Sequence, residues 1–479
     1  MTNAAVSASG PTAPEGPTGK LATWLSILSW DHVPESVRLR AKHLVLDGVA
    51  CGLVGAQLPW SRTAVRGITA LEGTGSATVI GWGTTTSPAA AALLNGTFIQ
   101  GFELDDFHPL APLHSTSLVL PSLIATAELL GEVSGKDFLL GAIAGFEVGP
   151  RVGLALHGSQ MLNRGWHSGS VFGTHASAVA SGVLRRLTAA EFEDALGLAG
   201  TQSAGLMAAQ YEAMSKRMHH GFAARNGFYA AGLAAAGYTG IKRVFEREYG
   251  GFLSTFGEGH DPDAAQITRG LGELWHTGLI FVKSYSAMGG LHGAIDAAFE
   301  LRDRIPYPVR DIERIELEVS STVYHHGWWT PDRPLTTIGA QMNIGYAVAV
   351  ALLDGQVLPE QFTDRRLDAD DVWALVPRVQ VRHADEIDKA PPEERFSTRL
   401  KITLRDGTCL QSVVVQPRGG PANPLRDTAI VAKYRALASR VMEPDRVEAI
   451  ERQVLALDTL DDVHGLIALL AARVTGALD

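Results

Sequence analysis

The chain has 479 residues, of which 46% are apolar and 19% charged, a composition typical of a soluble globular protein with more than one domain. Its formal net charge of −10 argues against nucleic acid as the main partner, because phosphate binding requires clustered lysines and arginines. The two cysteines, Cys51 and Cys409, provide neither a disulfide framework nor a zinc-binding spacing, which favours a cytoplasmic location. No apolar run is typical of a membrane span, so we expect no membrane association.

The first part of the chain predicts helices almost throughout. Residues 1–19 are rich in small residues and proline without the order of a signal peptide, so we expect a disordered tail. From 20 to 284, apolar residues recur at helical spacing, and only 76–82 has the pattern of a strand. The predicted helices are 22–30, 34–56, 87–101, 115–131, 136–156, 170–187, 189–208 and 225–236.

The pattern changes near Pro306. Apolar and polar residues then alternate in 315–319 and 379–383, and the segments 397–404 and 409–416 flank a turn at Arg405–Thr408, which predicts a hairpin. Further helices are expected at 340–353, 359–362, 433–441, 445–457 and 463–470. The predicted fold class is therefore mainly α. A large all-helical domain is built from both chain ends, 20–284 and 425–479, around a smaller inserted α+β lid domain at 285–424.

An acidic and histidine-rich stretch, Gly101–Ser117, separates two apolar segments that carry no charge, 87–100 and 115–126. It contains the carboxylates Glu103, Asp105 and Asp106 and the imidazoles His108 and His114. Charge beside buried apolar surface is costly unless it is paired or used, so this stretch is a candidate site. A solvated loop between two buried helices is the alternative. If His114 begins the next helix, free backbone N–H groups there would suit a carboxylate ligand.

Four other stretches place ionisable groups among small or apolar residues: Gly165–Ser170, Tyr211–Gly227, Lys283–Gly293 and Val323–Trp329. A site for a polycarboxylate needs cations to hold the carboxylates and a group that transfers protons. The candidates for these roles are His114, His167, Lys216 and His292. Each has a structural alternative when taken alone, since a single histidine is often a core or capping residue and Lys216-Arg217 suits a solvated turn. Only convergence of several such loops would favour function.

A metal or cofactor site is a weaker hypothesis. Glu103, Asp105, His108 and His114 are suitable ligand types for a divalent ion, but they lack the fixed spacing of known metal motifs. The sequence also has no Gly-x-Ser-x-Gly elbow and no Gly-x-Gly-x-x-Gly after a strand. We therefore expect neither a metal nor a nucleotide cofactor.

At these residues the sequence resembles the MmgE/PrpD family, which includes 2-methylcitrate dehydratase, cis-aconitate decarboxylase and an iminodisuccinate epimerase. The resemblance extends over about residues 20–470. It rests on a series of short motifs in a fixed order, and no single motif is sufficient. The markers are Leu46–Gly48, Asn95-Gly96, Glu103–Asp106, His114, Thr126–Glu128, Gly145–Val148, Gly165–His167, Lys216–His219 with Gly221, Ala223-Ala224, Asn226-Gly227, Lys283 and Tyr285, His292–Asp296, and Gly345–Ala349.

The resemblance implies a homodimer with a cofactor-free active site between the large domain and the lid. Its active-site histidines correspond to His114, His167 and His292, its lysine to Lys216 and its acidic position to Glu103. Asp105 would then orient a histidine. The substrate contacts that we expect are Phe107, His219, Lys283 and Tyr324, the last as the nearest match for a lid tyrosine.

Three departures from the family pattern bear on the substrate. Glu103 stands where many members have aspartate, Phe107 where decarboxylase-type members have a hydroxyl residue, and Ser115 where proline is usual. These departures disfavour methylcitrate and cis-aconitate. The sequence therefore predicts a cofactor-independent lyase that transfers a proton beside a carboxylate of a small di- or tricarboxylate, with dehydration favoured. Epimerisation, decarboxylation and a non-catalytic carboxylate binder remain alternatives.

Overall fold

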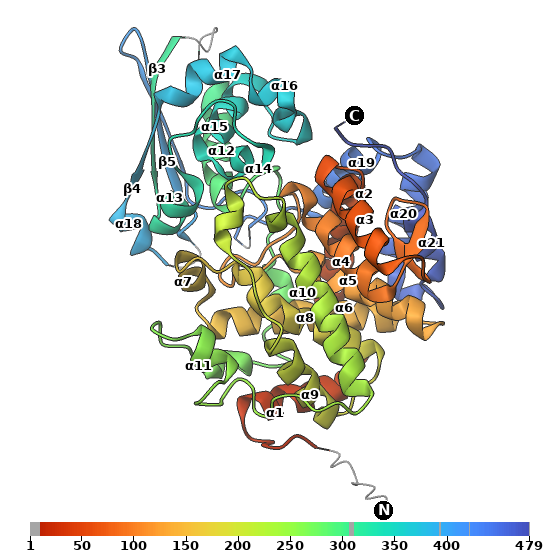
Figure 1. Ribbon diagram of the computed structural model, residues 1–479. Coiled ribbons are helices and arrows are strands. Elements are labelled where there is room, and N and C mark those ends of the chain that lie inside the picture. The colour runs from red at the N-terminus through yellow and green to blue at the C-terminus, as the bar shows by residue number, and fades with distance from the viewer. Residues whose placement is uncertain (1–9, 306–310, 392–393, 421, 479) are drawn as a thin grey trace, which may run out of the picture.

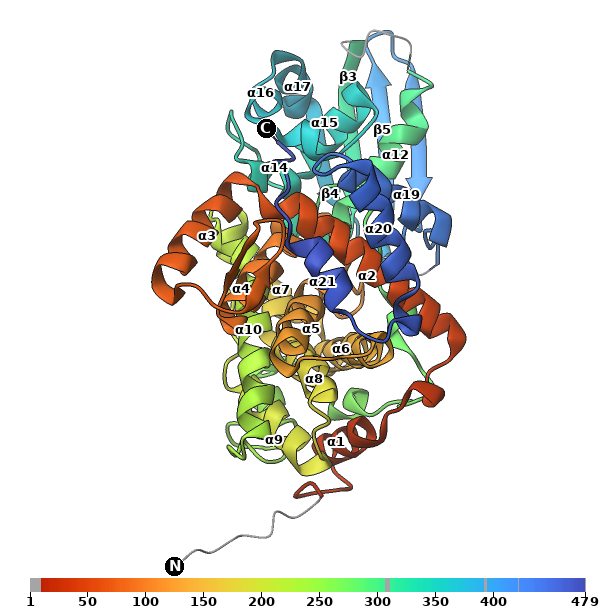
Figure 2. The ribbon, with the colours of Figure 1, turned by 90° about the vertical axis from the view of Figure 1, so that its right-hand side faces the viewer.

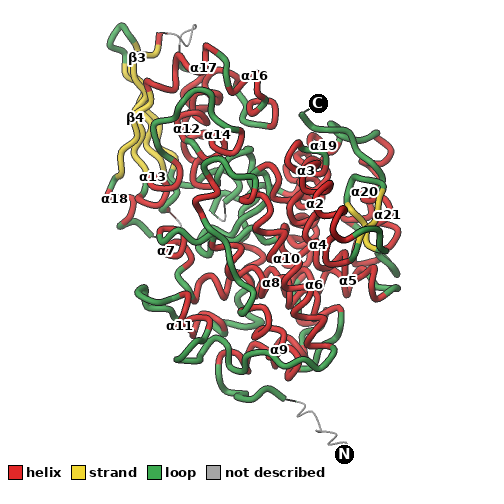
Figure 3. The backbone as a smooth tube through the Cα atoms, in the orientation of Figure 1, coloured by secondary structure: helices red, strands yellow, loops and turns green. Residues whose placement is uncertain are grey.

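The computed structural model describes residues 10–305, 311–391, 394–420 and 422–478 of the chain. Helices dominate the described part, and the strands gather mainly at one end, so the expected mainly α class is confirmed (Figures 1 and 3). The helices of the first 284 residues are α1 (Pro17–Ile27), α2 (Glu35–Ala56), α3 (Pro59–Glu72), α4 (Pro88–Ile99), α5 (Thr116–Leu130), α6 (Gly135–Ala155), α7 (Gly158–Asn163), α8 (Ser168–Leu184), α9 (Ala189–Gly200), α10 (Ser215–Ala235) and α11 (Phe252–Phe256).

Helices α4, α5, α6, α8 and α10 pack against one another in the middle of this helical unit. Glycines allow a close approach between α4 and α10. A Cβ atom added to Gly96 would lie 2.9 Å from the Cα atom of Gly221, and one added to Gly221 would lie 2.2 Å from the carbonyl oxygen of Leu93. This crossing brings the first turns of α10 beside the polar loop that follows α4.

The end of the chain returns to this unit. Helices α19 (Asp427–Ala438), α20 (Pro444–Leu455) and α21 (His464–Ala471) lie beside α2, as Figure 2 shows. The short hairpin of β1 (Ala77–Val79) and β2 (Thr84–Thr86) is joined to α21, since the N–H of Gly81 donates to the carbonyl of Leu470. Helices from both ends of the chain thus pack together in the large helical unit.

The smaller α+β unit holds a four-stranded sheet in the order β4-β3-β5-β6. β3 (Ile312–Val319) runs parallel to β4 (Val379–His383) and antiparallel to β5 (Thr398–Leu404), which forms the predicted hairpin with β6 (Cys409–Val414). Helix α12 (His292–Arg302) packs on β5 and β6 and against α15. The remaining helices are α13 (Ser321–Gly327), α14 (Thr337–Met342), α15 (Ile344–Asp354), α16 (Asp364–Leu367), α17 (Asp370–Leu375) and α18 (Asp385–Asp388).

Two large hydrophobic cores hold the described part of the molecule together. One belongs to the helical unit alone and contains Leu118, Phe172 and Phe192 among others. The other is continuous from α2 through the sheet to α21, so that Leu44 and Ile315 belong to one buried cluster. The smaller unit therefore shares its apolar interior with the helical unit.

Several expectations need correction. Residues 1–9 lie outside the described part, but residues 10–19 are not a disordered tail, because Thr12 donates to Glu193 and Thr18 to Glu246, and α1 starts at Pro17. The helix expected at 225–236 begins ten residues earlier, at Ser215, and the helix expected to reach residue 208 ends at Gly200. Helix α3 was not predicted.

Helix α6 is long and apolar enough to cross a membrane by length and composition, although the sequence analysis found no such segment. In the structure 94% of its most apolar window is buried inside the protein. Its apolar surface is therefore covered by neighbouring helices such as α8.

Candidate active site

The polar loop after α4 carries a buried carboxylate that three cations surround. Glu103 follows the turn Gln100–Phe102 in a left-handed backbone conformation, with φ 54°, and is 2% exposed. Lys216 Nζ lies 2.5 Å from its Oε1 atom, Lys283 Nζ lies 3.1 Å from Oε2, and Arg217 Nη1 lies 3.6 Å from Oε1. Burial raises the pKa of Glu103, but Lys216 and Lys283 bring it well below its usual range. The extra methylene of Glu103 is thus used to reach these cations.

Asp105 lies behind this cluster and supports His114. Its Oδ2 atom is 3.1 Å from His114 Nδ1, and its Oδ1 atom is 3.8 Å from Lys283 Nζ. Asp105 is fully buried, whereas His114 is 15% exposed at its side chain. Counted together, three cations face the two carboxylates of Glu103 and Asp105, so one positive charge is left over. An environment of this kind stabilises an added anion.

The N-terminus of α5 is occupied by a carboxylate of the protein itself. Asp106 accepts hydrogen bonds from the backbone N–H groups of Ser115 and Thr116 and from the hydroxyl of Thr116. Burial raises the pKa of Asp106 to about 6, and the neighbouring Asp105 acts in the same direction. The expectation that these N–H groups bind a ligand is therefore wrong, because the loop folds back to cap its own helix.

Four histidines gather where α8 and α10 begin. His167 and His220 are stacked, with ring centroids 5.0 Å apart and an angle of 15° between the planes, and His114 lies 4.9 Å from His220. The Nδ1 atoms of His167 and His219 are 2.8 Å apart. Burial lowers the pKa of His167 and of His220 well below the usual range, and the pKa of His219 to about 4. At neutral pH these three rings are uncharged.

These groups line a cavity with a free volume of about 90 Å³. It lies between the helical unit and the smaller unit, because its walls come from both. The lining residues are Glu103, Phe107, Pro112, His114, Ser159, Leu162, His167, Ser168, Met207, Lys216, Met288, Gly289, Gly290, Thr322, Val323, His326, Met342 and Phe396. Lys216, His114 and His167 thus come from the helical unit, whereas the smaller unit contributes mainly apolar side chains together with Thr322 and His326.

The structure brings most of the predicted site residues together. Five of them line the cavity: Glu103, Phe107, His114, His167 and Lys216. Asp105 and Lys283 stand directly behind Glu103 and His114, fully buried, where they contact protein groups. Lys283 therefore supports Glu103 in this structure and does not line the cavity.

Three predicted residues lie away from the cavity wall. His292 is buried against Tyr285, with ring centroids 5.0 Å apart, and burial together with Lys283 lowers its pKa to about 3. Tyr324 packs beside His325 and is absent from the lining. His219 lines a separate surface groove.

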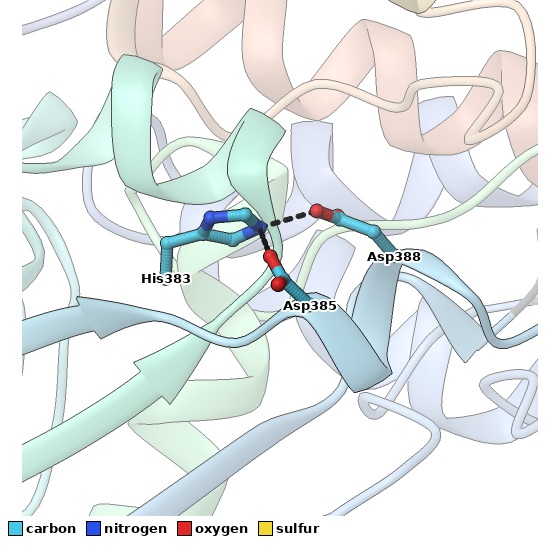
Figure 4. Close-up of side chains that lie close together, drawn as sticks. All are labelled: His383, Asp385 and Asp388. Atoms are coloured by element: carbon cyan, nitrogen blue, oxygen red, sulfur yellow. Dashed lines mark hydrogen bonds and ion pairs between the residues drawn. The ribbon is translucent and has the colours of Figure 1, made fainter.

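The predicted metal ligands do not form a ligand set. His108 accepts a hydrogen bond from the N–H of Ala111 and lies 3.3 Å from His276, while Glu103 is held by cations. In the described part of the chain, ligand atoms of three candidate residues approach within 4.8 Å only at His383, Asp385 and Asp388 (Figure 4). His383 is the last residue of β4 and Asp385 and Asp388 belong to α18, and none of the three lines the cavity.

The sequence analysis did not assign a site role to Arg217, His220 or His326. Arg217 contacts Glu103 and donates to Gln341, and His220 completes the histidine cluster. Lys216 and His220 are four residues apart and lie on one face once α10 starts at Ser215. A helical interpretation of 215–220 would have found them. The alternative of a solvated turn at Lys216-Arg217 is wrong, since both side chains are buried.

A buried excess of positive charge, a carboxylate-supported imidazole and a small cavity define a candidate acid–base active site for a small anion in a mainly α protein. The chain belongs to the MmgE/PrpD family. The model of its N-terminal domain matches residues 19–265, and that of its C-terminal domain matches residues 285–459.

Known relatives are similar along nearly the whole chain. The cis-aconitate decarboxylase-like protein oryM of Aspergillus oryzae is 45% identical over 479 residues, covering 96% of this chain and 99% of that protein. A cis-aconitate decarboxylase of Aspergillus terreus is 42% identical, covering 97% and 98%. The cis-aconitate decarboxylase of Homo sapiens is 28% identical, covering 95% and 94%.

Proposed function

We propose that this protein is a lyase acting on a small polycarboxylate, and that its reaction is the decarboxylation of cis-aconitate or of a close analogue. The observation that carries the proposal is the excess positive charge around Glu103, beside a small cavity that His114 and His167 also line. The relatives at 42–45% identity are named for decarboxylation. We therefore place decarboxylation ahead of the dehydration that the sequence analysis favoured.

The chemistry of the substrate fits this arrangement. In cis-aconitate the carboxymethyl carbon is attached to the double bond, so loss of its carboxyl group as CO2 leaves an electron pair spread over three carbons and a conjugated carboxylate. Lys216, with the surplus charge behind it, would stabilise that negative charge. A proton delivered to the far end of the three-carbon unit then completes the reaction and shifts the double bond.

His114 is the residue that we assign as proton donor. Asp105 Oδ2 lies 3.1 Å from its Nδ1 atom and orients the ring, so Nε2 is the nitrogen that remains to transfer a proton. His167 lies on the same cavity wall, and its Nδ1 atom is already engaged by His219. Phe107, Met288 and Phe396 exclude water from the opposite side, which strengthens the electrostatic interactions inside.

The test is to incubate the purified protein with cis-aconitate in D2O and to follow CO2 release and the product by NMR. Decarboxylation with a double-bond shift predicts methylenesuccinate carrying one deuterium on the saturated carbon between its double bond and a carboxylate. Parallel incubations with 2-methylcitrate and iminodisuccinate test dehydration and epimerisation. Binding of cis-aconitate without CO2 release or deuterium uptake would instead indicate a non-catalytic binder and overturn the proposal.

A further inference from the structure

The contact between His167 and His219 places one shared proton between two imidazoles. Their Nδ1 atoms are 2.8 Å apart, a hydrogen-bond distance at which one ring must donate while the other accepts. His167 is buried at the start of α8, and His219 is half-buried in the first turns of α10. The pair therefore joins an interior ring to a ring near the surface.

The two rings face different spaces. His167 lines the small cavity together with Glu103 and Lys216. His219 instead lines an open groove of about 560 Å³, whose walls include Gln202, Arg225 and Asn226. The histidine pair thus forms part of the wall that separates the groove from the cavity.

The other two histidines of the cluster offer no such connection. His114 is held by Asp105, and His220 Nδ1 lies 2.8 Å from the hydroxyl of Ser117. Among the described residues, the Nε2 atom of His220 is buried and has no hydrogen-bond partner. Neither ring lines the groove, so His219 alone of the four connects the cluster to it.

A proton route of this kind answers a need of the reaction. Each decarboxylation transfers one proton to carbon, so one proton must reach the cavity from solvent in every cycle. The cavity is small, at about 90 Å³, so a bound substrate leaves little space for water inside it.

We propose that His219 is a proton relay that reloads His167 from the outer groove; this rests on the proposed lyase function. Water in the groove protonates His219 at Nε2, and the resulting imidazolium donates its Nδ1 proton to Nδ1 of His167. His167 then donates its Nε2 proton into the cavity, to carbon or to His114. One proton enters and one leaves, with no oxidation or reduction. Between turnovers, exchange of ring protons with water in the emptied cavity and in the groove restores the starting tautomers, with a proton on Nε2 of His167 and on Nδ1 of His219.

The electrostatic surroundings of His167 and His219 favour rings that hold an added proton only briefly. Burial and Lys216 together lower the pKa of both rings, so neither stores an extra proton at neutral pH. The charged and titratable groups that face the pair are Lys216, His114, His220 and Glu103, with Arg225 along the groove. His219 acts on the substrate only through His167 and is a positioning and relay residue.

The test compares His219→Gln and His219→Ala with His325→Gln, an exposed histidine of the smaller unit, as matched control. We expect His219→Gln to lower kcat about tenfold or more and to change KM less than about threefold, because proton supply is lost while the cavity is kept. Imidazole added to His219→Ala restores kcat in a saturable manner. His325→Gln retains wild-type kinetics. A kcat of His219→Gln within about twofold of wild type, or no rescue by imidazole, would overturn the relay.

A second measurement needs no turnover and separates the relay from the proposed function. In protein labelled with 15N at histidine, the ring shifts of His167 report its tautomer. They should follow the protonation of His219 in the wild type and lose that response in His219→Gln. Unchanged His167 shifts in His219→Gln would contradict the relay. Absence of CO2 release by the wild type would contradict the proposed function instead.

Discussion

The carboxylate of Glu103 lies 2.5 Å from the ammonium group of Lys216, although 113 positions separate the two residues in the chain. Lys283 and Arg217 approach the same carboxylate, and all four groups are buried. Charges taken out of water in this way depend on one another, since removal of one partner leaves the others uncompensated. The first prediction follows from this dependence.

Glu103→Gln removes the negative charge that three buried cations share. We expect it to lower the free energy of unfolding by about 3–5 kcal/mol, because the cations stay buried without a counterion. Urea unfolding followed by circular dichroism measures the change. Glu448→Gln, at an exposed i,i+4 pair with Arg452, should differ little from wild type. Equal stability of the Glu103→Gln protein and wild type would contradict the assigned role of Glu103.

Asp105→Asn tests the support of His114. The variant keeps the shape of the side chain but removes the carboxylate charge beside the His114 ring, so kcat for the proposed reaction should fall about 100-fold with little change in KM. His114→Ala should lower kcat by a similar factor. The double variant Asp105→Asn/His114→Ala should be no slower than His114→Ala, because the two residues act as a unit. Additive losses in steady-state kinetics would show that Asp105 acts independently of His114.

The wall opposite the cations offers a structural test at Gly289. A Cβ atom added there would lie 2.4 Å from the ring of Phe107, so Gly289→Ala must push that ring from its place. Overpacking of this kind costs about 1–3 kcal/mol, and it should also raise KM, because Phe107 lines the cavity. Phe107→Leu combined with Gly289→Ala relieves the contact. Thermal unfolding and KM are measured on the single and double variants. A double variant that is no more stable than Gly289→Ala and has the same KM would refute the predicted clash with Phe107.

Buried His175 predicts a loss of stability in mild acid. It lies between Phe245 and Phe252, and burial lowers its pKa from 6.5 to about 4. The unfolded chain therefore binds more protons than the folded protein between these values, so the stability that is present above pH 6.5 is lost as the pH falls toward 4. His175→Leu should make the free energy of unfolding less dependent on pH in this window.

The control for this prediction is His325→Gln, at an exposed histidine, whose pH dependence should match that of wild type. Chemical unfolding at half-unit steps between pH 4 and 7 measures both variants. Asp106 acts in the opposite direction, because a pKa raised to about 6 costs stability as the pH rises from 4 toward 6. The pH dependence of the free energy of unfolding that remains in His175→Leu would therefore include the opposing contribution of Asp106.

The helices and the sheet were largely predictable because their signals are local. Apolar spacing located α2, α5 and α6, and alternation with a turn located β5 and β6. The start of α10 was missed for a physical reason. Lys216 and Arg217 look like a solvated turn until Glu103 is brought to them from more than 100 residues away. Local pattern cannot show such compensation.

For the candidate site, the residues that converge were predictable, but the contacts of several of them were not. Convergence of the loops bearing His114, His167 and Lys216 was expected from the family resemblance, and the structure places all three around one cavity. No local pattern indicated that Asp106 would cap α5 and so close that helix end to a ligand. Nor could the sequence show that His219 faces the outer groove while its hydrogen-bonded neighbour His167 faces the cavity.

The hydrophobic core that runs from α2 through the sheet to α21 has a consequence for recombination between family members. Side chains such as Leu44 and Ile315 are packed as parts of one interior, so the segment 285–424 is not an interchangeable module. A chimera that exchanges it would place mismatched side chains across the seam that also forms the cavity walls. Transfer of substrate preference between relatives is therefore better attempted at single wall positions than by exchange of the whole segment.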